Sequence, residues 1–206
     1  EFEHKFCDLL KTYQPPAAVS QELFKTEMKN LHMYGYGLKS MMLSMIETAC
    51  RITGGKENLH CAEEIIRLGQ ELLQKPVTLL DGVEDVLLQL QGKYKLVLAT
   101  KGDLFDQKRK VMDSGLVRYF CHIEIMSDKK EADYQKLLNT MGCAPQNFLM
   151  LGNSIKSDIL PILNLGGYVA HIPYHITWQY ENHEGNVTHP NFLQLKNIKD
   201  IIGYLL

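Results

Sequence analysis

Three short polar clusters, each placed directly after an apolar run, contain the residues most able to do chemistry. They are Thr100-Lys101-Gly102-Asp103, Ser127-Asp128-Lys129-Lys130, and Gly152-Asn153-Ser154 with Ser157 and Asp158 one turn later. In open α/β sheets, ligands bind outside the carboxyl ends of the strands. Hydroxyls, lysines and a carboxylate that follow three separate strands therefore predict one shared ligand site.

The first two clusters suit a bound phosphate. Thr100 offers a hydroxyl donor, and Lys129 offers a compact positive charge for phosphoryl oxygens. Gly102 removes a side chain where backbone N–H groups at the next helix start must approach an anion, and Lys101 precedes it. We therefore expect Thr100, Lys101, Gly102 and Lys129 to bind a phosphorylated substrate.

The third cluster suits a divalent cation. The amide oxygen of Asn153 and the carboxylate of Asp158 are hard oxygen ligands of the kind that Mg²⁺ takes, with water and substrate completing an octahedron. A different metal site at His171 and His175 is disfavoured, because Pro173 lies between them and no Cys pair completes the set.

Each cluster also has a purely structural interpretation. Thr100 can simply end a β-branched strand, and Asp103 is well placed to cap the next helix. Lys129 and Lys130 can form a solvated charge pair, although the start of a helix disfavours cations. That conflict favours one of the two as an anion ligand and leaves Lys130 as the alternative to Lys129.

The residues before Pro76 follow a helical period throughout. Apolar residues recur at helical spacing, and Pro15-Pro16 ends the first helix while Ser20 can cap the second. The predicted helices span residues 2–13, 20–31, 38–52 and 58–74.

After Pro76 short apolar runs alternate with amphipathic segments. The predicted strands span residues 94–100, 121–126, 148–151 and 168–172, and the predicted helices span 83–90, 104–113, 131–141 and 155–163. This alternation predicts a doubly wound, parallel, Rossmann-like α/β sheet. We expect an all-helical cap domain over 1–76 and the α/β core domain over 77–206. Residues 174–190 lack a period and are predicted to form a surface excursion, and 198–206 a final helix or turn.

The composition narrows the class of partner. The 206 residues carry a formal net charge of −2, which excludes a strongly basic nucleic-acid footprint. No apolar run approaches the roughly 20 residues that cross a bilayer. The five scattered cysteines favour free thiols in a reducing compartment. We expect a cytoplasmic protein whose partner is a small phosphorylated metabolite, neither nucleic acid nor membrane, and nothing indicates its oligomeric state.

The three clusters resemble motifs of a known family. Leu98-Ala99-Thr100-Lys101-Gly102, Ser127-Asp128-Lys129 and the stretch 151–158 resemble the second, third and fourth motifs of haloacid dehalogenase-like phosphohydrolases. The helical first third resembles the cap inserted after that family's first strand. The resemblance implies that Thr100 hydrogen-bonds the transferring phosphoryl group, that Lys129 holds this group and the nucleophile, and that Asn153 and Asp158 help to hold Mg²⁺.

Two departures from the family pattern matter. The family more often has Asp at the position of Asn153, so one negative charge is missing from the metal site. The family's first motif, Asp-x-Asp-Gly-Thr, supplies the nucleophile, yet no Asp-x-Asp occurs in the chain, and Asp81-Gly82 lies after the cap. We expect that the first strand and its loop are absent from these residues, and that the chain as given binds ligands at best, without turnover.

Three functions are compatible with these residues. The first is a Mg²⁺-dependent phosphatase of small phosphorylated metabolites that acts through an aspartyl-phosphate. The alternative is a catalytically inactive protein that binds a phosphorylated ligand or a partner protein. Dehalogenation ranks behind both, because Lys129, Asn153 and Asp158 suit phosphate and metal better than a halocarboxylate.

Overall fold

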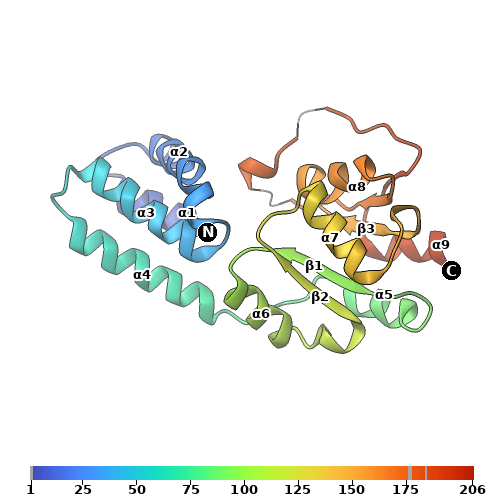
Figure 1. Ribbon diagram of the computed structural model, residues 1–206. Helices are drawn as coiled ribbons and strands as arrows, with labels where there is room; N and C mark the ends of the chain where they lie inside the picture. The colour runs from blue at the N-terminus through green and yellow to red at the C-terminus, as the bar shows by residue number, and fades with distance from the viewer. Residues whose placement is uncertain (1, 176–177, 184) are drawn as a thin grey trace. The chain divides into compact units, whose positions relative to one another are not determined.

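The computed structural model describes residues 2–175, 178–183 and 185–206, and it divides into two compact units (Figure 1). The first unit comprises Glu1–Val77 and Lys101–Asp113, and the second comprises Thr78–Thr100 and Ser114–Leu206. The segment Lys101–Asp113 therefore groups with the N-terminal helices. The division into a cap domain over 1–76 and a core domain over 77–206 stays a prediction.

The first unit is helical. Its helices are α1 (Phe2–Leu9), α2 (Pro16–Tyr34), α3 (Leu38–Thr53), α4 (Asn58–Gln74) and α6 (Leu104–Asp113). Its core is a cluster of buried side chains from α1 to α4 and the turn after α1: Phe6, Cys7, Leu10, Val19, Leu23, Met45, Ala49, Cys61 and Ile65.

The predicted cap of the second helix is wrong. α2 begins at Pro16, because proline at the first helical position loses no hydrogen bond. Ser20 therefore lies inside α2, and its hydroxyl donates to the Glu3 carboxylate at 2.5 Å. The helix continues to Tyr34 and ends at Gly35, whose φ of 68° suits glycine.

The second unit alternates strands with helices, as predicted. Its strands are β1 (Val97–Lys101, of which Lys101 groups with the first unit), β2 (His122–Met126), β3 (Leu149–Gly152), β4 (Tyr168–His171) and β5 (Phe192–Gln194). Its α-helices are α5 (Val83–Leu90), α7 (Glu131–Met141), α8 (Leu160–Asn164) and α9 (Ile202–Leu205). Short helical turns are η1 (Leu116–Tyr119), η2 (Pro145–Asn147), η3 (Ile155–Ile159), η4 (Gln179–Glu181) and η5 (Ile198–Ile201).

The described strands pair into two sheets, β1-β2 and β3-β4-β5. Both ladders of the second sheet are parallel, with Met150 opposite Val169 and Ala170 opposite Leu193. This pairing confirms the α/β class. The main differences from prediction are three. β1 begins at Val97 rather than Tyr94, and the predicted helix over 155–163 is the turn η3 followed by α8. The sequence pattern does not predict β5, because three residues carry too little periodicity to signal a strand.

Two apolar clusters hold the second unit together. One includes Met126, Tyr134, Met150 and Ile159, with Val97 and Ala99 of β1 packed against it. A second cluster includes Val86, Ala170 and Ile201. Residues of β1 and β3 therefore pack into one core, although the two strands belong to different sheets.

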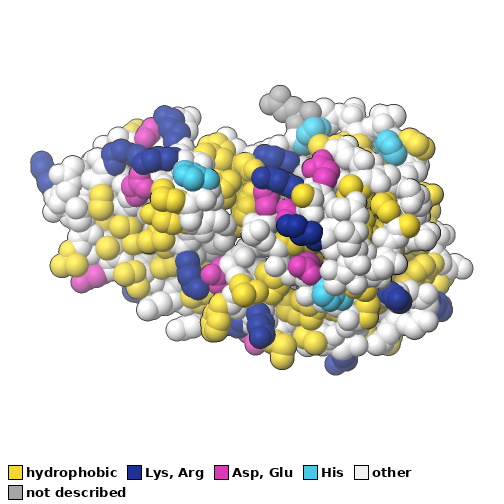
Figure 2. Space-filling view, viewed as in Figure 1, with side chains coloured by type: hydrophobic (Ala, Val, Ile, Leu, Met, Phe, Trp, Pro, Cys, Tyr) yellow, Lys and Arg dark blue, Asp and Glu magenta, His cyan; other side chains and the backbone are white. Residues whose placement is uncertain are grey.

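Acidic and basic side chains are interspersed on the face shown in Figure 2. Within the described residues, every helix is too short or too polar to span a membrane.

Candidate functional site

The centre of the candidate site is an ion pair between Lys129 and Asp158. Lys129 Nζ lies 2.7 Å from Asp158 Oδ1, and the two side chains are 10% and 7% exposed. Lys129 follows the end of β2, and Asp158 lies in η3, after the end of β3. Two of the predicted site residues, 29 positions apart, are thus brought together. A carboxylate this buried requires such a partner.

A π-helical turn presents Asp158. The Ser154 side chain caps η3 by accepting a hydrogen bond from the Ser157 N–H at 3.0 Å. The Ser154 N–H donates to Asp158 Oδ2 at 3.0 Å, so both carboxylate oxygens of Asp158 are engaged. π-helical turns are rare and occur frequently at functional sites.

Gly152 is required for this arrangement. A Cβ atom at Gly152 would overlap the Asp158 carboxylate. The residue at the end of β3 is therefore glycine because the carboxylate occupies the space of a side chain.

Tyr134 supports the same turn from α7. It is fully buried, and its hydroxyl donates to the Ser157 carbonyl at 3.0 Å. Burial, together with the negative charges of Asp158 and Glu181, raises the pKa of the Tyr134 phenol. Tyr134 therefore stays a neutral donor beside the site.

Asn153 lies exposed between β3 and η3. The backbone carbonyl oxygen of Asn153 lies 3.0 Å from His171 Nε2, and His171 Nδ1 lies 3.0 Å from Gln194 Oε1. These contacts tie the loop that carries Asn153 to the ends of β4 and β5. Both ring nitrogens of His171 thus lie within hydrogen-bonding distance of protein oxygens.

The first cluster is divided between the two units. Thr100 lies in the second unit, half-buried near the end of β1, whereas Lys101 and Gly102 group with the first. There the Lys101 ammonium lies 4.2 Å from the centre of the Tyr36 ring. Gly102 has a φ of 143°, and the Gln107 side chain fills the space beside it, 3.0 Å from where a Cβ would lie. That Thr100, Lys101, Gly102 and Lys129 bind substrate together stays a prediction.

Asp103 caps the start of α6, and Lys130 is a solvated cation. Asp103 accepts the Asp106 N–H at 2.9 Å, which is the capping contact expected of it. Lys130 pairs with Asp128 at 2.9 Å, and its side chain is 71% exposed. Of the two lysines, the one paired with Asp158 is Lys129, and Lys130 is the solvated one.

One acidic residue of this region was missed from sequence. Glu181 lies in η4, within the segment predicted to form a surface excursion. Its Oε2 accepts hydrogen bonds from the hydroxyls of Ser154 and of Ser157, the latter at 2.6 Å. A single glutamate without a spaced partner gives no sequence signal, and only the tertiary contact identifies it.

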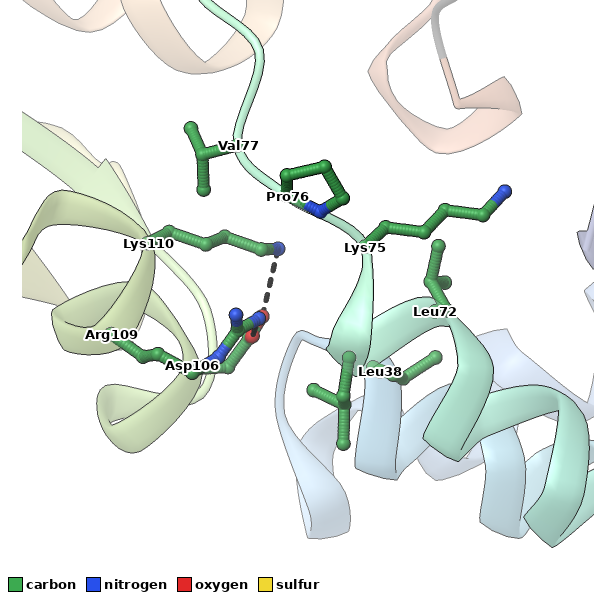
Figure 3. Close-up of a pocket in the computed structure, with 9 residues that line it drawn as sticks. Leu38, Leu72, Lys75, Pro76, Val77, Asp106, Arg109 and Lys110 are labelled. Atoms are coloured by element: carbon green, nitrogen blue, oxygen red, sulfur yellow. Dashed lines mark hydrogen bonds and ion pairs between the residues drawn. The ribbon is translucent and has the colours of Figure 1, made fainter. Parts of the chain in front are cut away.

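A separate pocket lies in the first unit. It has a volume of 290 Å³ and is lined by the start of α3, the end of α4, the chain after α4, and α6 (Figure 3). Its lining includes Leu38, Leu72, Pro76, Asp106 and Lys110. Burial opposes ionisation of Asp106, but hydrogen bonds from Lys110 and Arg109 outweigh it and lower its pKa. None of the predicted site residues lines this pocket, and the Asp106 carboxylate is already paired with Arg109 and Lys110.

The donor set fits Mg²⁺ only in part. Asn153 and Asp158 supply the hard oxygens that this ion prefers. Among the described residues, no three His, Cys, Asp or Glu side chains gather as a ready metal set. Further ligands for an octahedron would have to come from elsewhere.

The chain is similar to proteins of one family. A model of haloacid dehalogenase-like hydrolases matches residues 29–166. N-acylneuraminate-9-phosphatase of Mus musculus is 28% identical over 141 residues, which cover 66% of this chain and 57% of that protein. The chain thus spans little more than half the length of the curated relatives it matches.

Solved structures agree with this match. A haloacid dehalogenase-like family hydrolase of Xanthomonas campestris has a TM-score of 0.87 and 32% identity, covering 99% of this chain and 82% of that one. A HAD-hydrolase of Bacillus subtilis bound to magnesium, 15% identical with a TM-score of 0.61 over 99% of this chain and 91% of that one, shares the fold. The predicted Rossmann-like core with a helical cap is confirmed. The chain belongs to the haloacid dehalogenase-like hydrolase family.

Proposed function

We propose that the whole protein is a Mg²⁺-dependent phosphatase of small phosphorylated metabolites that acts through an aspartyl-phosphate. The observation that carries this proposal is the buried pair of Lys129 and Asp158, which brings a phosphate-binding cation and a metal-binding carboxylate to one place. The name of the relatives, N-acylneuraminate-9-phosphatase, supports a phosphorylated sugar acid as one substrate to test.

Each site residue of this chain would have a separate role in the reaction. Thr100 donates a hydrogen bond to the phosphoryl group, and Lys129 stabilises the negative charge that develops on it. Asn153 and Asp158 hold Mg²⁺, which neutralises charge on the phosphoryl oxygens when it is bound. Lys129 would then shift from Asp158 toward the phosphoryl group and the nucleophile.

We place the nucleophilic aspartate on a strand outside residues 1–206. β1 ends one described sheet and β3 ends the other, yet side chains of both pack into a single core. One further strand between β1 and β3 would join the two sheets. An aspartate at the carboxyl end of that strand would lie between Thr100 and Asp158, where parallel sheets bind ligands.

The chain as given would then bind phosphate without turnover. This is also the behaviour of the second candidate, an inactive protein that binds a phosphorylated ligand. The absence of Asp-x-Asp from the printed sequence is the observation that favours it.

The test compares the full-length gene product with residues 1–206. Both are assayed for phosphate release from p-nitrophenyl phosphate and N-acylneuraminate 9-phosphate, with and without Mg²⁺. We expect Mg²⁺-dependent release by the full-length protein only, loss of release on Lys129→Ala, and near-normal release on Lys130→Ala. No release by the full-length protein in any condition would exclude the phosphatase and favour the inactive binder.

A further inference from the structure

We infer that Glu181 is a positioning residue for Asp158, acting through the hydroxyls of Ser154 and Ser157. This inference rests on the proposed function, because Asp158 is there a ligand of Mg²⁺. It assigns a task to η4, for which neither the sequence pattern nor the family resemblance supplies one.

A single oxygen of Glu181 accepts both serine hydroxyls, from residues 24 and 27 positions away in the chain. Ser154 and Ser157 are 6% and 5% exposed, so their hydroxyls have little access to water. Buried hydroxyls need partners, and hydrogen bonds to a carboxylate are about twice as strong as neutral ones.

The two serines in turn hold Asp158. Ser154 caps η3 through the Ser157 N–H, and its own N–H donates to the Asp158 carboxylate. The Ser154 carbonyl accepts the Asp158 N–H at 2.8 Å and the Ile159 N–H at 3.2 Å. Ser154 therefore fixes the position of Asp158 together with Lys129, and Glu181 fixes the orientation of the Ser154 hydroxyl.

A second contact to η3 holds η4 in place. Lys156, on the same π-helical turn, donates to the Tyr180 carbonyl at 3.3 Å and lies 3.4 Å from the centre of the Tyr180 ring. The segment that carries Glu181 is thus attached to η3 by a second residue. The two contacts together fasten the excursion onto the turn that presents Asp158.

Metal sites depend on such outer partners. Mutating a group that orients a metal ligand typically lowers metal affinity by about 10- to 100-fold. Because Glu181 acts through hydrogen bonds to one oxygen, Glu181→Gln can keep both contacts through its amide oxygen, whereas Glu181→Ala loses them. If Glu181 acted only through its charge, Glu181→Gln and Glu181→Ala would lose metal affinity to the same extent.

The experiment measures Mn²⁺ affinity by electron paramagnetic resonance, and hydrogen–deuterium exchange of residues 154–159, on the full-length protein. We expect Glu181→Ala to weaken Mn²⁺ binding by about tenfold and to speed exchange in 154–159, while kcat at saturating metal changes little. Glu181→Gln should restore most of the Mn²⁺ affinity and most of the protection of residues 154–159 from exchange. The matched control is Glu84→Ala, since Glu84 also accepts side-chain hydrogen bonds from two residues, Arg118 and Tyr119, neither of them in η3.

The outcomes separate this inference from the proposed function. Faster exchange in Glu181→Ala, with rescue by Glu181→Gln, supports the positioning role even if the wild-type protein releases no phosphate. Wild-type exchange and wild-type Mn²⁺ affinity in Glu181→Ala would overturn it. Equal loss in the Ala and Gln variants would also overturn it, in favour of a purely electrostatic role.

Discussion

At the scale of single residues, the site depends on a buried pair of opposite charges. Removing one partner of such a pair leaves the other charge buried and uncompensated, which costs about 3–5 kcal/mol. An exposed pair is worth about 1 kcal/mol or less. Lys129 and Lys130 are neighbours in sequence but fall into these two different classes.

Lys129→Met should therefore lower the free energy of unfolding by about 3–5 kcal/mol, and Lys130→Met by about 1 kcal/mol or less. The measurement is urea denaturation of residues 1–206. The double variant Lys129→Met/Asp158→Asn should lose less than the sum of the single losses, because neither charge is left alone. Equal effects at positions 129 and 130 would contradict the ion pair seen here.

A second residue-scale prediction concerns Asp103. The Asp106 N–H bonds to its carboxylate and, against burial, lowers its pKa, with Lys39 adding to the effect. A lowered pKa stabilises the folded state above the ordinary carboxyl value of 3.8, and this contribution is lost as the pH falls through the lower folded value. Asp103→Ala should cost about 0.5–2 kcal/mol at pH 7 and flatten the loss of stability in acid.

The control for Asp103 is Asp113→Ala at the other end of α6. Asp113 pairs with Arg109 through a half-exposed carboxylate, so its loss should change stability by less than about 1 kcal/mol. Unfolding is followed from pH 7 to pH 2 for both variants. An acid profile of Asp103→Ala that parallels the wild type would show that the cap contributes nothing.

At the scale of elements, the end of β3 and the π-helical turn that follows are fitted to each other. Gly152→Ala should cost about 1–3 kcal/mol as an overpacked site and weaken Mn²⁺ binding, because its Cβ displaces the Asp158 carboxylate. Gly203→Ala in α9 is the control, since open space surrounds that position. It should be neutral or stabilising by up to about 1 kcal/mol. Equal changes in stability for Gly152→Ala and Gly203→Ala would mean that η3 shifts without cost to make room for the added Cβ.

The sequence predicts most elements but not their detail. Apolar spacing predicts long periodic segments such as α3, α4 and α7 to within a residue or two. β5 is three residues long, and the π-helical character of η3 comes from hydrogen bonds around Ser154 rather than from a period.

The candidate site was predictable to the same extent. Polar residues at strand ends were identifiable, since chain order alone puts them there. Glu181 was not, because its partners lie 24 and 27 residues away and nothing in its own segment indicates them.

At the scale of the whole molecule, the main expectation is that a further strand pairs with β1 and β3 and joins the two sheets. Terminal strands of sheets offer rows of backbone donors and acceptors, and an added strand can pair with them. A peptide with an apolar run of about five to six residues ending in Asp-x-Asp should bind residues 1–206 between β1 and β3. Because it binds the folded state, it should raise the melting temperature in a concentration-dependent way.

The matched control is the same peptide with proline in the middle of the run. Proline cannot donate to a ladder and is excluded from central strands, so this peptide should give no shift. Thermal melts followed by circular dichroism, with titrations of either peptide, decide the matter. A strand that must pair on both sides loses more from proline than one that adds to a single edge, because both of its ladders are interrupted. Equal shifts from the two peptides would therefore indicate nonspecific apolar binding and would remove the reason for placing the nucleophile between β1 and β3.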